Sequence, residues 1–136
     1  MTAIIINRNK ILLLKRRNVP IITNPGIWSF LSGARDVNER YIETAYREIR
    51  EESGIDRRSL NLLFKERMLI ADRKRGIMWL NWVFIFRSNT GIVRLDYENS
   101  RYRWATIGQI EKEINYTNIF INNKELVKRI RGYVYG

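Results

Sequence analysis

The 136-residue sequence contains neither cysteine nor histidine. Disulfide bonds, thiolate zinc sites, cysteine nucleophiles and histidine general bases are therefore all excluded. A metal site in this chain must be built from oxygen ligands, which favour hard cations such as Mg²⁺ or Mn²⁺. Acid–base chemistry must likewise be carried by carboxylates, lysine or tyrosine.

Long hydrophobic runs are also missing. Purely apolar runs such as Ile11–Leu14 and Val83–Phe86 are far shorter than the roughly 20 residues of a membrane span. The first residues, Met1–Asn7, lack the basic and long apolar regions of a signal peptide, so we expect a cytoplasmic protein with no membrane partner. Proline occurs only at positions 20 and 25, and no repeat or linker interrupts the chain, which predicts a single domain over residues 1–136.

Acidic residues are the minority among the charged ones. The sequence has 14 Asp and Glu against 25 Lys and Arg, which gives a net charge of +11. Such a charge indicates a polyanionic partner, which can be a phosphorylated small molecule, RNA or DNA. A generally basic, solvated surface explains the same charge equally well at this stage.

The pattern of apolar residues predicts an α/β architecture with a mixed sheet. Strands are expected at Thr2–Ile6, Lys10–Lys15, Trp28–Leu31, Leu60–Ala71, Ile77–Arg87, Ile92–Leu95 and Tyr102–Ala105. Helices are expected at Glu39–Ser53, Ile107–Ile114 and Asn123–Tyr135, the second of them capped by Thr106. The two prolines place a loop at Arg16–Gly26.

The expected helix Glu39–Ser53 has the clearest signal. Apolar residues recur in it at spacings of three and four, Asn38 is suited to cap its start, and Gly54 is suited to end it. Three glutamates, at positions 48, 51 and 52, share one face of this helix, where like charges repel. A divalent cation would turn that repulsion into coordination. Gly33, in the loop before the helix, lets the backbone approach a ligand closely.

From Gly33 to Ile55 the sequence resembles the Nudix box of a known hydrolase family. The match consists of Gly33, five residues, Glu39, seven residues, Arg47-Glu48-Ile49, one residue, Glu51-Glu52, one residue and Gly54-Ile55. Two of these positions, Ile49 and Ile55, require only an aliphatic residue. The other seven are fixed, and seven fixed residues would coincide by chance on the order of once in 10⁸ placements. The flanking segments also resemble the family, namely Lys10–Arg17, Trp28–Gly33 and Glu98 with Trp104.

The resemblance implies a Nudix-type α/β/α sandwich with a mixed β-sheet and a loop-helix-loop catalytic motif. It also implies a metal-dependent pyrophosphohydrolase that cleaves a phosphoanhydride bond of a nucleoside diphosphate derivative by water attack, with Mg²⁺ or Mn²⁺ as cofactor. A nucleoside triphosphate is the first substrate we expect. ADP-ribose, a dinucleoside polyphosphate or an RNA 5′ end are alternatives, as is a non-catalytic nucleotide- or RNA-binding module. A monomer and a homodimer are both compatible with the sequence.

The resemblance also assigns roles to individual residues of the motif. Glu48 and Glu52 would be metal ligands, Glu51 would be a further ligand or would orient the water, and the carbonyl of Ser32 would complete the shell. The general base would be Glu51 or Glu98. The supporting roles are an ion pair from Arg47 to a helix carboxylate, a brace between loop and helix from Glu39, and the turn positions Gly33, next to the substrate, and Gly54.

Residues outside the box supply candidate substrate contacts. Arg16 and Arg17 follow a strand expected near the box, and arginine is suited to bidentate phosphate binding. Trp28 precedes the box and is the best candidate for stacking on a base, although a core position is the more common fate of a strand aromatic. The sequence departs from the family pattern in two places. Leu31-Ser32 stand where Pro-Gly is common, and Asn38 replaces a glycine but tolerates left-handed φ.

Overall fold

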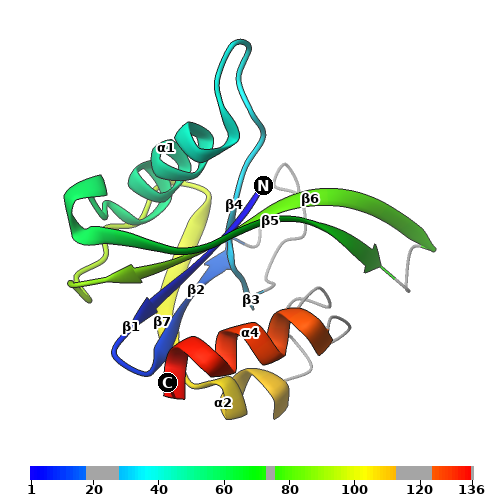
Figure 1. The fold of residues 1–136 in the computed structure, drawn as a ribbon. Coiled ribbons are helices and arrows are strands. Elements are labelled where there is room, and N and C mark those ends of the chain that lie inside the picture. Colours follow the sequence, from blue (N-terminus) through cyan, green and yellow to red (C-terminus); the bar gives the residue numbers. More distant parts are fainter. Residues whose placement is uncertain (18–27, 73–75, 113–123, 136) are drawn as a thin grey trace.

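The structure, a computed structural model, describes residues 1–17, 28–72, 76–112 and 124–135. Its strands are β1 (Thr2–Asn7), β2 (Lys10–Arg16), β3 (Trp28–Ser29), β4 (Leu31–Ser32), β5 (Leu60–Asp72), β6 (Ile77–Ser88) and β7 (Asn99–Ala105). Its helices are α1 (Tyr41–Ser53), a 3₁₀ turn at Arg57–Ser59, α2 (Ile107–Lys112) and α4 (Lys124–Tyr135). Figure 1 shows their arrangement.

The strands form one mixed sheet. Its main order is β3-β2-β1-β6-β5, with β4 also paired to β1 and β7 also paired to β2. Strands β1 and β6 run parallel, with Thr2 opposite Val83, whereas the other pairs are antiparallel. The short strand β3 pairs with β2, and β4, which follows it, pairs with β1. The segment that leads into α1 therefore starts from the edge of β1.

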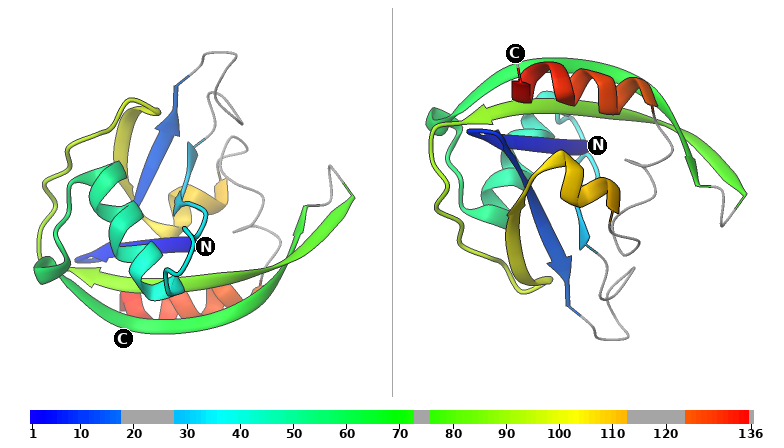
Figure 2. Two further views of the ribbon diagram at one scale, coloured as in Figure 1. Left: turned by 90° about the horizontal axis from the view of Figure 1, so that it is seen from above. Right: turned by 90° about the horizontal axis from the view of Figure 1, so that it is seen from below.

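Helices cover both faces of this sheet, as the two views of Figure 2 show. One core cluster packs under α1 and contains Ala45 and Ile49 together with strand residues such as Phe84. A second cluster lies on the opposite face and contains Ile107 of α2 with Leu126 and Ile130 of α4. Alternate residues of the fully buried stretch 3–6 of β1 contribute to the two clusters. The expected α/β/α sandwich with a mixed sheet is therefore confirmed.

The start of α1 differs from the prediction. The helix begins at Tyr41 with Arg40 as its N-cap, so Asn38 is not the cap. Asn38 instead takes a left-handed conformation, with φ of 64°, in the turn that precedes the helix. The prediction failed because Glu39, the next residue, is used for side-chain contacts with the helix instead of forming its first turn. The end is as predicted, because Gly54 caps α1 with φ of 74°.

The prediction of a strand at Ile92–Leu95 was wrong, because this segment forms no strand in the structure. Its Arg94 N–H instead donates across the fold to the Ser53 carbonyl at 2.7 Å. The carbonyl of Gly91, just before the segment, accepts from the Trp104 indole at 3.0 Å. The expected strand Trp28–Leu31 is split at Phe30, where the chain passes from pairing with β2 to pairing with β1.

The later helices agree with their predicted positions. The Thr106 hydroxyl accepts from the Gln109 N–H at 3.2 Å, and the Gln109 side chain accepts from the Thr106 N–H at 2.9 Å, which is a reciprocal cap for α2. Residues 18–26 of the expected loop, the last residues of the expected helix Ile107–Ile114 and Asn123 lie outside the described residues. No helix in the described part of the chain is long and apolar enough to span a membrane.

Candidate active site

Gly33 lies against the side chain of Glu48, between the sheet and α1. A Cβ atom at position 33 would stand 2.2 Å from the Glu48 carboxyl carbon, far inside contact distance. The backbone of Gly33 is held in place by Met1, since the Met1 amino group donates to the Gly33 carbonyl at 2.8 Å and the Gly33 N–H donates to the Met1 carbonyl at 3.2 Å. Any larger residue at this position would therefore displace the Glu48 side chain.

Glu52 is a buried carboxylate. Only 5% of the residue is exposed, and its carboxylate accepts a hydrogen bond from the Ser32 N–H at 3.3 Å. Burial, followed by the negative charges of Glu48 and Asp96, raises the pKa of Glu52 to about 9. Within the described ranges no Lys or Arg forms an ion pair with Glu52. A carboxylate in this position is electrostatically suited to receive a cation.

Glu48 lies one turn before Glu52, and its side chain is 15% exposed. Burial raises its pKa, while the hydrogen bond from Arg47 opposes that shift. Because residues four apart share one face of a helix, Glu48 and Glu52 present their carboxylates on the same side of α1, next to Ser32 and Gly33.

Arg47 forms ion pairs with three glutamates of the motif. Its guanidinium bonds both carboxylate oxygens of Glu39 at 2.9 Å, Glu48 at 2.9 Å and Glu51 at 3.3 Å, and it reaches the carbonyl of Ala34 at 3.1 Å. These bonds join the loop before the helix to α1. They raise the pKa of Arg47, so the guanidinium is a permanent positive charge beside the glutamates.

Glu39 is held on two sides. Besides Arg47, the Thr44 hydroxyl donates to its carboxylate at 2.6 Å and the Asp36 N–H donates at 3.2 Å. The hydrogen bonds from Arg47 and Thr44 lower the pKa of Glu39 to about 2. The contacts of Glu39 therefore link the loop before α1 to the first two turns of that helix.

Glu51 is more exposed than the other two box glutamates. Its side chain is 54% exposed and is paired with Arg47. In the part of the chain that the structure describes, no three acidic side chains gather closely enough to hold a metal ion. Arg47 thus contacts both Glu48 and Glu51, and the Glu51 side chain is much the more exposed of the two.

The 89–98 loop carries two further acids toward the site. Its middle is held on the end of α1 by the bond from Arg94 to Ser53, and the Cβ of Arg94 would lie 3.1 Å from a Cβ at Gly54. Asp96 and Glu98 follow, and the charges of both raise the pKa of Glu52. The buried Asn99 amide donates to the Asp96 carboxylate at 3.0 Å and fixes it.

Asp96 was missed by the sequence analysis. The signal that was available is the acidic pair in Asp96-Tyr97-Glu98, of which only Glu98 was singled out. That signal does not show where Asp96 lies. Its position beside α1 depends on the long-range bond from Arg94 to Ser53, which only the structure shows.

Arg16 and Arg17 lie beside the same loop. An Arg16 guanidinium nitrogen is 3.4 Å from a Glu98 carboxylate oxygen. Arg17 donates from its backbone to the Glu98 carbonyl at 2.8 Å and from its side chain to the Tyr97 carbonyl at 2.7 Å. Trp28, in contrast, packs against the core cluster on the α2 and α4 side of the sheet, away from α1.

The described residues fit a hard divalent cation. Mg²⁺ is commonly bound through one or two carboxylates, with waters and substrate phosphates filling the remaining positions. Glu48 and Glu52 supply such a pair, and burial makes their negative charges costly without a cation. The absence of a third carboxylate at ion-binding distance among the described residues is compatible with this mode of binding.

Comparison with known proteins places the chain in a family. The family model described as "NUDIX domain" matches residues 1–129. The chain belongs to the Nudix family. The geometry around Gly33, Glu48 and Glu52 is therefore that of its Nudix box, and the resemblance inferred from the sequence is confirmed.

Individual Nudix proteins are similar to this chain to different extents. A mouse bis(5′-nucleosyl)-tetraphosphatase (asymmetrical) is 30% identical over 79 residues, which cover 57% of this chain and 54% of the mouse protein. This chain thus spans about half the length of that relative. The structure of a Caenorhabditis elegans Ap4A hydrolase binary complex superposes with a TM-score of 0.71 at 20% identity, covering 98% of this chain and 93% of that chain. A Methanosarcina mazei MutT protein gives a TM-score of 0.72 at 21% identity, covering 97% and 91%. These two structures share the fold.

Proposed function

We propose that this Nudix protein is a metal-dependent pyrophosphohydrolase that cleaves a phosphoanhydride bond of a nucleotide by water attack. The observation that carries the proposal is the pair of carboxylates Glu48 and Glu52 beside Gly33, of which Glu52 is buried with no ion-pair partner among the described residues. Such a pair is suited to bind the divalent cation that phosphate chemistry requires.

Three residues would hold the cation, and two others would keep the surrounding loop and helix in position. A bound Mg²⁺ or Mn²⁺ neutralises the phosphate oxygens and acidifies water. Glu48, Glu52 and the Ser32 carbonyl would hold the ion, and Arg47 keeps Glu48 in place through its 2.9 Å bond. The ion pairs of Arg47 with Glu39 keep the preceding loop against the helix, so that Gly33 stays beside Glu48.

We assign the general base to Glu98. Its charge raises the pKa of both Glu48 and Glu52, whereas Glu51 is tied to Arg47 at 3.3 Å. Glu98 would take the proton from the attacking water, and Arg16 and Arg17, which contact the same loop, would bind the phosphates. Glu51 then supports the network and is not the base.

A dinucleoside polyphosphate is the substrate we favour. The sequence alone placed a nucleoside triphosphate first, but the mouse relative is named for asymmetrical cleavage of a bis(5′-nucleosyl) tetraphosphate. Asymmetrical cleavage of four linked phosphates yields a nucleoside triphosphate and a nucleoside monophosphate. ADP-ribose and nucleoside triphosphates remain competitors for the same site.

The test is a substrate panel with a Mg²⁺ titration. Dinucleoside tetraphosphate, nucleoside triphosphate, ADP-ribose and a 5′-triphosphorylated oligonucleotide are incubated with wild type and Glu52→Gln, and products are separated by chromatography. We expect the dinucleoside tetraphosphate to be cleaved fastest and the variant to lose about 100-fold or more in kcat.

Three outcomes would contradict parts of the proposal. A loss of less than about tenfold in Glu52→Gln would remove the metal-binding role of this carboxylate. Nucleotide binding without turnover at any metal concentration would instead identify a non-catalytic module. Fastest cleavage of a nucleoside triphosphate would keep the activity and replace only the favoured substrate.

A further inference from the structure

The outer parts of β5 and β6 extend beyond the body of the molecule as a two-stranded ribbon (Figure 1). Their register pairs Arg67 with Trp82, Leu69 with Leu80 and Ala71 with Met78. Because directly opposed residues project to the same side of an antiparallel pair, Arg67, Leu69, Met78, Leu80 and Trp82 share one face of the ribbon.

This face is on the α1 side of the sheet. Trp82 packs against the core cluster under α1, and its ring contacts Tyr41, the first residue of that helix, with centroids 5.7 Å apart. Farther out, the aliphatic side chains are open to solvent, with 54% of Leu69, 64% of Met78 and 59% of Leu80 exposed. We refer to Tyr41, Leu69, Met78, Leu80 and Trp82 as the shelf.

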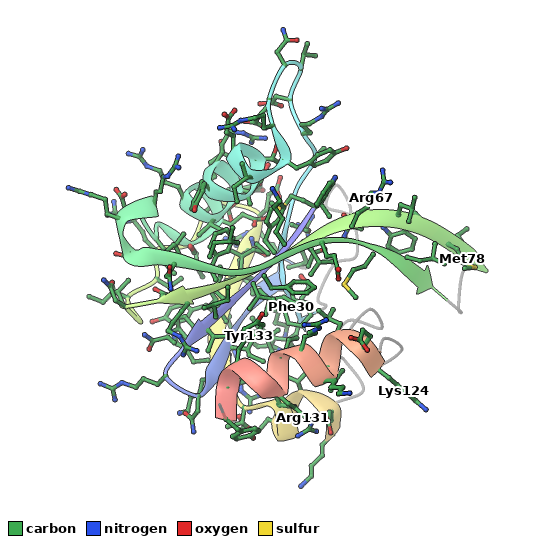
Figure 3. All side chains as sticks on the ribbon, viewed as in Figure 1. Phe30, Arg67, Met78, Lys124, Arg131 and Tyr133 are labelled. Carbon is green, nitrogen blue, oxygen red and sulfur yellow. The ribbon has the colours of Figure 1, made fainter. Side chains whose placement is uncertain are left out.

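Cationic side chains border the shelf. The Lys65 ammonium lies 5.9 Å from the centroid of the Trp82 ring, and the Arg35 guanidinium lies 4.9 Å from the centroid of the Tyr41 ring. Arg67 is exposed on the same face, and Figure 3 shows it on the ribbon between the body and Met78. The acidic neighbour Glu66 pairs with Val83, which places it on the opposite face. The shelf is therefore apolar and aromatic within a positive border.

The shelf begins next to the candidate active site. Tyr41 lies about two helical turns before Glu48, hence on the same side of α1 and about 10 Å away along its axis. Trp82 directly precedes Val83, which pairs with Thr2, and Thr2 pairs in turn with Ser32. A chain molecule on the shelf could thus enter the site without crossing the core.

We propose that the shelf binds a single-stranded polynucleotide, with its bases on the apolar side chains and its phosphates at Lys65, Arg67 and Arg35. Sequence-tolerant binding of single strands combines positive charge along the backbone with aromatic side chains on which bases stack. The shelf has cations at its border and the aromatic rings of Tyr41 and Trp82. The net charge of +11 favours a polyanion over a second copy of this basic chain. From Trp82 to Met78 the strand runs about 13 Å, which is longer than one base needs.

The proposal is independent of which nucleotide the site hydrolyses. It is tested by fluorescence anisotropy with an oligonucleotide of about 12 residues, labelled at its 3′ end and carrying a 5′ monophosphate. The charge-reversal variant is Lys65→Glu/Arg67→Glu. Its matched control is Lys124→Glu/Lys128→Glu on α4, where both lysines are exposed and the change in net charge is the same. Figure 3 shows Lys124 on this helix, away from the ribbon.

We expect Lys65→Glu/Arg67→Glu to weaken binding about tenfold or more and to reduce the slope of log K against log salt by about two. A second variant, Leu69→Ser/Leu80→Ser, should weaken binding several-fold with an unchanged salt slope, because it removes apolar contact and no charge. Glu52→Gln should bind as wild type does, which separates this surface from the proposed hydrolysis.

Equal weakening by the shelf and α4 charge reversals would overturn the proposal, because it would show that only net charge matters. Binding unaffected by Leu69→Ser/Leu80→Ser, in a protein with wild-type melting behaviour, would also overturn it. In that case the exposed apolar residues serve a different kind of partner.

Discussion

At the scale of single residues, the site depends on how closely Gly33 and Glu48 approach each other. The 2.2 Å separation that a Cβ would have from the Glu48 carboxyl carbon leaves no room for alanine without moving the glutamate. The reason for glycine here is space, since the residue does not have positive φ. Gly54, by comparison, is required by its left-handed conformation.

Gly33→Ala should therefore reduce catalysis more than stability. The displaced Glu48 would misplace the cation, and displacements of about 1 Å can cost on the order of 100-fold in rate. The measurement is kcat together with the Mg²⁺ concentration at half-maximal activity. Gly108→Ala is the matched control, because a Cβ there meets nothing within 4 Å. A variant with unchanged kcat would show that Glu48 need not occupy its present position.

Glu39 gives a prediction about pH. Its pKa in the folded protein is about 2, lowered from 4.5 mainly by the hydrogen bond from Arg47. A lowered carboxyl pKa stabilises the fold at pH values above the unfolded pKa, and that stabilisation disappears as the pH falls through the folded value. Wild type should hence be more stable than Glu39→Gln at pH 7, and the difference should shrink between about pH 4.5 and pH 2.

Urea denaturation of both proteins across that range measures the effect. A stability difference that stays constant from pH 7 to pH 2 would mean that ionised Glu39 does not support the loop. Salt should change the difference only modestly, since the carboxylate and guanidinium are in direct contact.

At the scale of elements, the 89–98 loop completes the site. It is fixed at Gly91 by Trp104, at Arg94 by Ser53 and at Asp96 by Asn99. Because the bond to Ser53 involves the last residue of α1, the loop and the box helix are positioned together. Asp96 and Glu98 thus face a carboxylate pair that lies far away in the sequence.

Asp96→Asn should weaken metal binding. Removal of this negative charge leaves Glu48 and Glu52 in place but lowers the local attraction for a cation, and changes next to metal ligands typically cost 10–100-fold in affinity. We expect the half-saturating Mg²⁺ concentration to rise by about tenfold. Asp56→Asn, which alters the cap of the 3₁₀ turn, is the control. Equal metal affinities in wild type and Asp96→Asn would place Asp96 outside the site.

Local patterns predicted much of the fold, and long-range contacts explain where they failed. The periodicity of α1 and its terminal Gly54 are properties of neighbouring residues, so both were predictable. The strand expected at Ile92–Leu95 was not formed. Within it the Arg94 N–H bonds to the carbonyl of Ser53, the last residue of α1, instead of to a neighbouring strand. The same limit applies to the site. The sequence placed Glu51 on one helix face with Glu48 and Glu52, but the 54% exposure of the Glu51 side chain could be read only from the structure.

At the scale of the whole molecule, a small acidic site is set in a strongly basic chain. The net charge of +11 favours polyanions at the surface, while the carboxylates Glu48, Asp96 and Glu98 act together on the buried Glu52. Ribbon residues on the α1 side add exposed cations and apolar side chains beside that site. The proposed metal and nucleotide would therefore be attracted to neighbouring but electrostatically opposite regions.

The most direct measurement is Mn²⁺ binding, followed by electron paramagnetic resonance, in wild type, Glu52→Gln and Glu51→Gln. The paired position of Glu48 and Glu52 and the outward position of Glu51 predict that Glu52→Gln loses most of the bound Mn²⁺, whereas Glu51→Gln retains it with near wild-type affinity. Undiminished Mn²⁺ binding in Glu52→Gln, or an equal loss in Glu51→Gln, would contradict the account.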